Sequence, residues 1–100
     1  MFEQLRELLA GYFHQDWDLE FANHSEVAHH FALQAESSSV ESVLGQLAIL
    51  AASADEAKIE DILTDAGCYY RPTESSLEEW LKDFSAEISQ VSWKRRIENG

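Results

Sequence analysis

Cysteine, glycine and proline are all scarce in this chain of 100 residues. Cys68 is the single cysteine, so no disulfide can form within the chain and no cysteine-based zinc site can exist. A reducing compartment suits this composition. The four glycines form neither a phosphate-binding loop nor a Gly-x-Ser-x-Gly elbow, and the HExxH sequence of zinc proteases is missing. The sequence therefore offers no familiar signature of catalysis.

Long hydrophobic runs are also missing. The longest apolar stretch covers residues 47–52, whereas a transmembrane helix needs ~20 apolar residues. The start of the chain mixes charged with apolar side chains and lacks the basic beginning and apolar core of a secretory signal. We therefore expect a soluble, cytoplasmic protein.

Basic residues are few, since seven Lys and Arg stand against 19 Asp and Glu, which gives a formal net charge of -12. Lys94, Arg95 and Arg96 lie together near the C-terminus, so the middle of the chain is more acidic still. A field of this sign repels nucleic acid and anionic membranes and attracts basic surfaces. We expect neither nucleic acid nor membrane as a partner.

Apolar side chains are what the sequence has in quantity. Hydrophobic residues make up 45% of the chain and aromatic residues 11%, which is typical of a packed domain and not of a disordered acidic tail. A chain of this length ordinarily forms one core. We therefore expect a single domain over residues 1–100.

The apolar residues recur every three or four positions in five segments, as in amphipathic helices. The first segment runs from Phe2 to about His14. The second begins after Asn23, a favoured N-cap residue, and ends near Glu36.

Capping signals mark the other three helices. A capping box at Ser38 starts the third helix, and a second box at residues 53–56, with Ser53 as the N-cap, starts the fourth. Gly67, a favoured C-terminal cap, ends the fourth helix. Ser76 starts the fifth helix, which is expected to end near residue 93.

Two segments between these helices break the pattern. Residues 16–21 alternate acidic and apolar side chains with a period of two, and because no partner strand is present we expect an extended loop there. Residues 68–74 contain the only proline and are also expected to form a loop. The predicted fold class is all-α, a single-domain bundle of about five helices.

Candidate metal ligands and nucleophiles lack partners at a useful spacing. Helical metal ligands are three or four residues apart, whereas His24 and His29 are five apart. Residues 16–27 begin like a calcium loop, but the sixth position, which needs glycine, is Phe21. Cys68 follows a helix end and is expected to be a buried structural thiol. We expect no catalytic residue, no metal and no cofactor.

Acidic and aromatic residues are combined in both irregular segments. Acidic charge speeds the encounter with a basic partner, and aromatic side chains supply the buried anchors of interfaces. The aromatic residues Trp17, Tyr69 and Tyr70 are equally suited to closing the core of the bundle. From the residues alone, both interpretations stay open.

The string Tyr-Phe-His-Gln-Asp-Trp at residues 12–17, preceded by Leu-Leu-Ala-Gly at 8–11, resembles the opening motif of immunity proteins of contact-dependent growth inhibition (CDI). Gly-Cys-Tyr-Tyr at 67–70, followed by Pro72, is similar to a second motif of that family, as is Trp-Leu at 80–81. The similarity spans nearly the whole chain.

The resemblance implies a bacterial cytosolic protein that binds and neutralises the toxic C-terminal domain delivered by a neighbouring cell. Such toxins are often nucleases, so an acidic immunity protein is expected to occupy a basic substrate cleft. We expect a monomer that binds its toxin one to one and is not an enzyme. Specificity is expected on variable surface side chains. The candidate interface residues are Asp16, Trp17, Asp18, Glu20, Asp61, Asp65, Tyr69, Tyr70 and Glu74.

Two alternatives stay open. A small acidic adaptor or regulatory domain without a toxin partner has the same bulk properties, and the neighbouring genes distinguish the two. A metal-dependent enzyme requires stoichiometric metal with His14 or His24 as a ligand.

Overall fold

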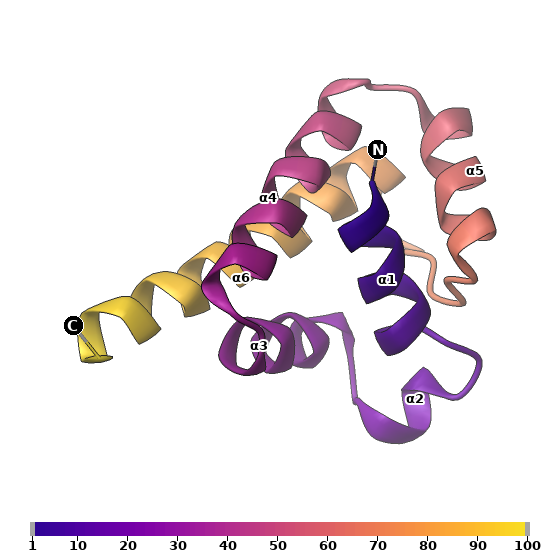
Figure 1. The fold of residues 1–100 in the computed structure, drawn as a ribbon. Helices are drawn as coiled ribbons and strands as arrows, with labels where there is room; N and C mark the ends of the chain where they lie inside the picture. Colours follow the sequence, from indigo (N-terminus) through magenta and orange to yellow (C-terminus); the bar gives the residue numbers. More distant parts are fainter. Residues whose placement is uncertain (1, 100) are drawn as a thin grey trace.

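The computed structural model describes residues 2–99 and shows six helices and no strand within them (Figure 1). Five of the helices correspond to the five predicted segments, so the all-α prediction is confirmed. The sixth is a single turn of four residues where the sequence predicts an extended loop, and that prediction is wrong. In chain order the helices are α1 (Glu3–Tyr12), α2 (Trp17–Glu20), α3 (His24–Gln34), α4 (Ser37–Ala52), α5 (Glu56–Ala66) and α6 (Leu77–Asn99).

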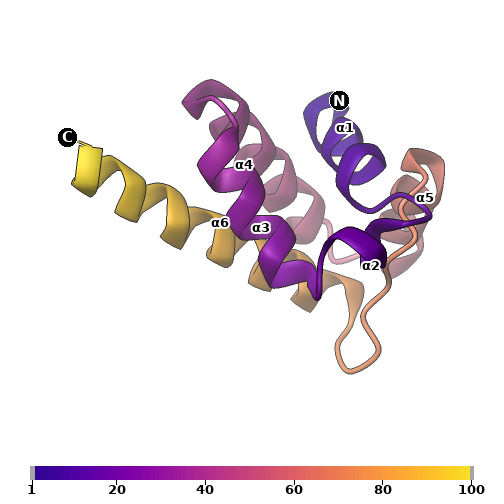
Figure 2. The same ribbon diagram turned by 90° about the horizontal axis from the view of Figure 1, so that it is seen from below.

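α6 is the longest helix and the one on which the others are assembled. α3 and α4 pack against it, and α1 packs between α4 and α5 (Figures 1 and 2). The C-terminal end of α6 projects past the other helices. The radius of gyration is 12.9 Å, close to the ~13 Å of a compact chain of this length. No helix within the described residues is long and apolar enough to cross a bilayer.

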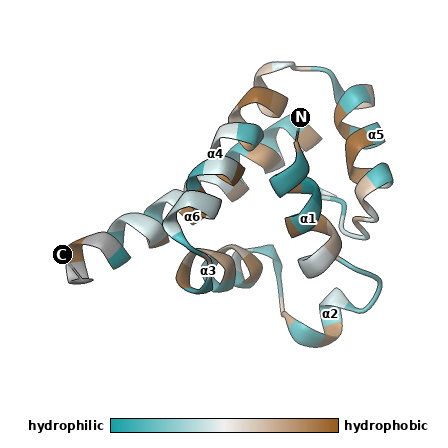
Figure 3. Cartoon of the chain, viewed as in Figure 1, coloured by the Kyte–Doolittle hydropathy of each residue, from teal (hydrophilic) through white to brown (hydrophobic). Residues whose placement is uncertain are grey.

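An aromatic cluster occupies the centre of the core. The ring centroid of Phe13 lies 5.8 Å from that of Trp80 and 5.7 Å from that of Phe84, and all three side chains are fully buried. Cys68 is buried as predicted. Hydrophobic and hydrophilic residues alternate along α1 and α5 (Figure 3), as in helices that turn one face to a core.

The N-caps of α3 and α6 are the residues that the sequence predicts. Asn23 accepts a hydrogen bond from the backbone N–H of Glu26 at 3.0 Å, and Ser76 accepts one from Glu79 at 3.1 Å. Each bond satisfies an N–H group that the first turn of a helix leaves without a partner. Gly67 ends α5 in the left-handed conformation, with φ 77°, as the sequence also predicts.

α4 and α5 begin at other residues than the sequence predicts. The N-cap of α4 is Glu36 instead of Ser38. The N-cap of α5 is Asp55, which accepts a hydrogen bond from the N–H of Lys58 at 3.1 Å, instead of Ser53. Ser, Asp and Glu side chains crowd both starts, so capping signals fix these helix ends only to within about two residues.

α6 is longer than predicted. It continues past Trp93 to Asn99. Arg95 holds this part against α3, because its guanidinium donates hydrogen bonds to the carbonyls of Ala32 and Ala35 at 3.1 and 3.0 Å. The arginine thereby satisfies carbonyl groups that the end of α3 leaves without a helical donor.

Candidate functional site

α2 and the loop at residues 68–74 lie against each other although they are far apart in the sequence. The ring centroids of Trp17 and Tyr70 are 5.3 Å apart, and both rings contact Phe13 in the core. Trp17 and Tyr70 are half-buried, so these two aromatic residues close the core. The two segments form one continuous surface, which we name the α2 surface (residues 14–20 and 68–74).

Arg71 fixes the shape of the loop. Its guanidinium donates hydrogen bonds to the carboxylate of Glu60 on α5 at 2.6 Å and to the carbonyls of Cys68 and Tyr70 at 2.7 and 2.8 Å. Hydrogen bonds that involve a charged group are roughly twice as strong as neutral ones. The loop is therefore held on α5 by its own arginine.

Leu19 and Tyr69 are the large apolar side chains that the α2 surface turns to solvent. Their exposed fractions are 82% and 63%. Both stand on hydrogen-bonded backbone, since the N–H of Tyr69 donates to the carbonyl of Phe13 at 2.7 Å and that of Leu19 to Asp16 at 3.0 Å. Exposed apolar residues on a fixed backbone are typical of protein interfaces. Sequence reasoning missed Leu19, because its exposure depends on the unpredicted turn of α2.

Acidic side chains lie on the same two segments as these apolar residues. Asp16, Asp18 and Glu74 are exposed and have no ion pair within the described residues. Glu20 contacts His14, with Oε2 3.3 Å from Nε2. The α2 surface therefore presents three carboxylates that form no ion pair with any described cation.

The two remaining candidate residues lie on α5. Asp65 is exposed and forms an ion pair with Arg6 of α1 at 3.6 Å. Asp61 also faces solvent, and no described contact joins it to the α2 surface. The structure thus brings Trp17 of α2 against Tyr70 of the loop, and the candidates next to them in sequence share these two segments. No described contact joins Glu74, Asp61 or Asp65 to α2.

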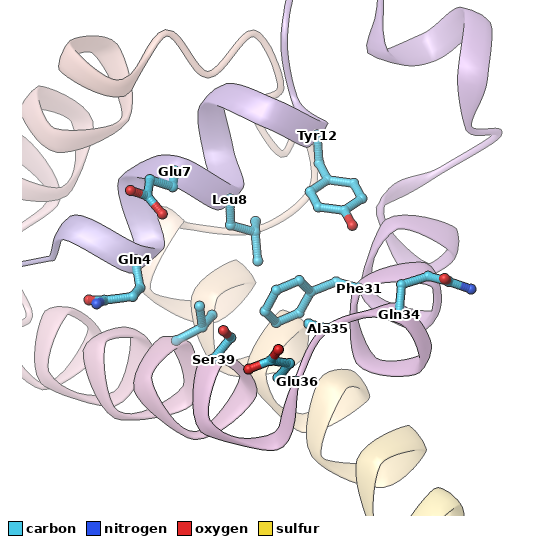
Figure 4. Close-up of a pocket in the computed structure, with 10 residues that line it drawn as sticks. Gln4, Glu7, Leu8, Tyr12, Phe31, Gln34, Ala35, Glu36 and Ser39 are labelled. Carbon is cyan, nitrogen blue, oxygen red and sulfur yellow. The ribbon is translucent and has the colours of Figure 1, made fainter.

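A hollow of about 290 Å³ opens between α1, α3 and the start of α4, and we name it the α1–α3 pocket (Figure 4). The buried side chains of Leu8, Phe31 and Val43 form its floor. Tyr12 stands at one side, its ring centroid 6.1 Å from that of Phe31. Tyr12 also contacts Phe21, directly after α2, at 6.0 Å, which places one side of the pocket near the end of α2.

Carboxylates lie at the rim of the α1–α3 pocket. Glu7 of α1 and Glu36 at the start of α4 both line it, and neither has an ion pair within the described part of the chain. A lysine or arginine side chain suits such a lining, because its stem packs on apolar groups while its charge meets carboxylates. The sequence gives no signal of this pocket, since its lining comes from three helices.

The histidines and the thiol are not arranged for metal or nucleophilic chemistry. No group of three or more His, Cys, Asp or Glu is placed to hold a metal ion in residues 2–99. His14 contacts Glu20, and Nδ1 of His24 lies 3.9 Å from Oε2 of Glu87. Burial raises the pKa of the Cys68 thiol, which keeps it protonated at neutral pH. The exposed apolar and acidic side chains of the α2 surface are instead suited to binding another protein.

Comparison with protein families gives a match over most of the chain. The model of the family described as CdiI immunity protein matches residues 1–88. The match includes the α2 surface and the α1–α3 pocket and ends within α6. No curated protein and no solved structure matches the chain.

Proposed function

The chain belongs to the CdiI immunity protein family, and from this premise we propose that it neutralises a nuclease toxin by covering the toxin's basic substrate cleft with the α2 surface. Proteins of this family neutralise a CDI toxin and are not enzymes. The adaptor and the metal-dependent enzyme are therefore set aside. In this proposal residues 1–100 form one immunity domain, which acts in the cytoplasm and binds one toxin domain per chain.

The combination of unpaired carboxylates with exposed apolar side chains on the α2 surface carries the proposal. A nuclease cleft holds Lys and Arg for the phosphates of its substrate, and carboxylates such as Asp16, Asp18 and Glu74 attract the same cations. Leu19 and Tyr69 supply apolar contact beside these charges. Because the surface is ordered by its own hydrogen bonds, little conformational entropy is lost on binding.

The α1–α3 pocket provides a place for one basic side chain of the toxin. The stem of a lysine or arginine contacts Leu8 and Phe31, and its charge lies between Glu7 and Glu36. The aromatic face of Phe31 adds a favourable cation–π contact. This contact extends the interface from the α2 surface toward α3 and α4.

An inhibition assay with the toxin domain encoded beside this chain tests the proposal. We expect the toxin to cleave RNA or DNA, and one equivalent of the immunity protein to abolish the cleavage. The association rate is expected to fall as salt is raised, because salt screens attraction between an acidic surface and a basic cleft. A toxin without nuclease activity, or an association rate independent of salt, contradicts the proposed mechanism.

A further inference from the structure

A groove runs between α4 and α6, and its charge differs from that of the α2 surface and the α1–α3 pocket, which the proposed function assigns to the toxin. Two hollows lie along it, one of about 510 Å³ and one of about 260 Å³. Their lining is electrically neutral, since Glu41 is its only acidic residue and Lys82 its only basic one, in a chain of net charge -12. A basic toxin gains little electrostatic attraction here.

The projecting end of α6 turns two large apolar side chains to solvent. Trp93 is 63% exposed and Ile97 60%. The two residues are four positions apart, so they lie on one side of the helix. Trp93 also borders the smaller hollow, which places it beside the groove. An exposed tryptophan next to a second exposed apolar residue is typical of an interface anchor.

The larger hollow lies further back along the same groove, and five of the eight residues that line it are alanine or serine. Ala48 of α4 faces Ser85 and Ala86 of α6 across it, and the buried residues Ala51 and Leu81 lie beneath. A volume of about 510 Å³ lined in this way accommodates an indole ring. α6 therefore carries an apolar projection and forms one wall of a hollow that suits it.

We propose that two copies of this chain pair through this groove, with Trp93 of each copy entering the larger hollow of the other. On α6, Ser89 lies midway between Trp93 and Ser85. A two-fold axis near Ser89 therefore places Trp93 of each copy opposite the larger hollow of the other. The same axis makes the two α6 helices antiparallel. Such an isologous contact closes on itself and forms a dimer.

The charges of α6 support an antiparallel pair. Residues 77–88 contain four acidic residues and one basic residue, for a net charge of -3, whereas residues 89–99 contain three basic and one acidic residue, for +2. An antiparallel pair places each acidic half beside the basic half of the other copy, although Arg95 itself is bound to carbonyls of α3. The antiparallel helix dipoles are favourable as well.

The paired face is separate from the toxin-facing side. The lining of the groove shares no residue with the α2 surface or the α1–α3 pocket, so a dimer leaves both free and binds two toxin domains. Trp93 and Ile97 lie beyond residue 88, where the family match ends. The dimer replaces the monomer that the sequence alone leads us to expect.

Sedimentation of the purified full chain over a roughly hundredfold concentration range tests the pairing. We expect the average mass to rise from 11.4 kDa toward twice that value. Trp93→Glu is expected to weaken the dimer at least about tenfold, whereas Leu33→Glu, at a residue 52% exposed on α3 and outside the groove, leaves it unchanged. Circular dichroism checks that both variants are folded.

A cysteine at Ser89 tests the axis without touching the apolar contacts. Under mild oxidation Ser89→Cys is expected to cross-link two copies, whereas Gln90→Cys, turned ~100° around the helix, links far fewer. A mass of 11.4 kDa at every concentration overturns the proposal. A dimer that survives Trp93→Glu also overturns the proposal. If the wild type is a monomer and Trp93→Glu abolishes toxin binding, the groove binds the toxin instead and the proposal is overturned.

Discussion

Glu56 caps a helix other than its own. Its two carboxylate oxygens accept hydrogen bonds from the backbone N–H groups of Leu77 and Glu78 at 2.8 and 2.9 Å. These are among the N–H groups that the first turn of α6 leaves without a helical partner. A side chain of α5 thus caps the start of the longest helix together with Ser76.

Replacing Glu56 by alanine is expected to lower the free energy of unfolding by about 1–2 kcal/mol, because two N–H groups lose their acceptor. Urea denaturation followed by circular dichroism measures the change. Asp61→Ala is the matched control, since Asp61 is an exposed acid of the same helix. Equal losses in the two variants would show that the cap is not the cause.

Cys68 is expected to lower the free energy of unfolding at alkaline pH. Burial raises the pKa of its thiol above the ordinary value, and the hydrogen bond to the Tyr70 carbonyl and the nearby Arg71 only partly offset this. Because the pKa is raised in the folded state, the unfolded chain loses its proton first, and stability present below about pH 8.5 declines above it. We expect Cys68→Ala to remove much of the decline between about pH 8.5 and 10, where tyrosine begins to ionise. Urea denaturation at a series of pH values tests this, and an unchanged pH profile contradicts it.

At the scale of whole elements, local signals placed most of the helices. Asn23, Ser76 and Gly67 act as caps through contacts with their own neighbours in sequence, which is why sequence reasoning finds them. α2 was missed because one turn holds too few residues for a helical period, and residues 16–21 mimic the alternation of a strand. The extra length of α6 depends on contacts of Arg95 with α3, which no local pattern encodes.

The candidate site, too, has parts that local sequence predicts and parts that depend on contacts between distant segments. The acids of α2 and the aromatic residues of the loop are near one another in sequence within each segment, so composition pointed to both. Their union depends on contacts such as that between Trp17 and Tyr70, and the α1–α3 pocket depends on three helices. Asp61 was chosen only for its charge, and no described contact places it with the others.

Charge reversal on α2 is expected to weaken toxin binding. The double variant Asp18→Lys with Glu20→Lys turns attraction for a basic cleft into repulsion, and we expect the dissociation constant to rise at least about tenfold. The matched control is Glu79→Lys with Asp83→Lys, which makes the same change of charge at exposed residues of α6. Titration calorimetry measures both. Equal effects would mean that only net charge matters, and an unchanged affinity removes α2 from the interface.

Neutralising the rim of the α1–α3 pocket tests the second contact. Glu7→Gln with Glu36→Gln keeps the shape of the pocket and removes its charge, so the dissociation of toxin is expected to be faster by about tenfold. Glu3→Gln with Glu79→Gln removes the same charge elsewhere on exposed residues and serves as the control. Surface plasmon resonance gives the rates, and indistinguishable dissociation of the two variants contradicts the contact.

At the scale of the molecule, charge and apolar surface are distributed unevenly. The α2 surface combines the exposed Leu19 and Tyr69 with carboxylates that have no ion pair within the described residues. The groove between α4 and α6 is neutral and borders the exposed Trp93. The first combination attracts a basic partner, and the second suits a surface that is complementary to itself. In the two proposals, toxin binding and self-association therefore use separate faces of one small helical fold.

Growth of bacteria that express the cognate toxin domain in their cytoplasm is the most direct measure of the central claim, that this chain neutralises a toxin through its α2 surface. Co-expression of the wild-type chain is expected to restore growth, and the folded Asp18→Lys, Glu20→Lys variant is expected to restore it poorly or not at all. Continued growth arrest with the wild-type chain, or full protection by the charge-reversed variant, contradicts the account.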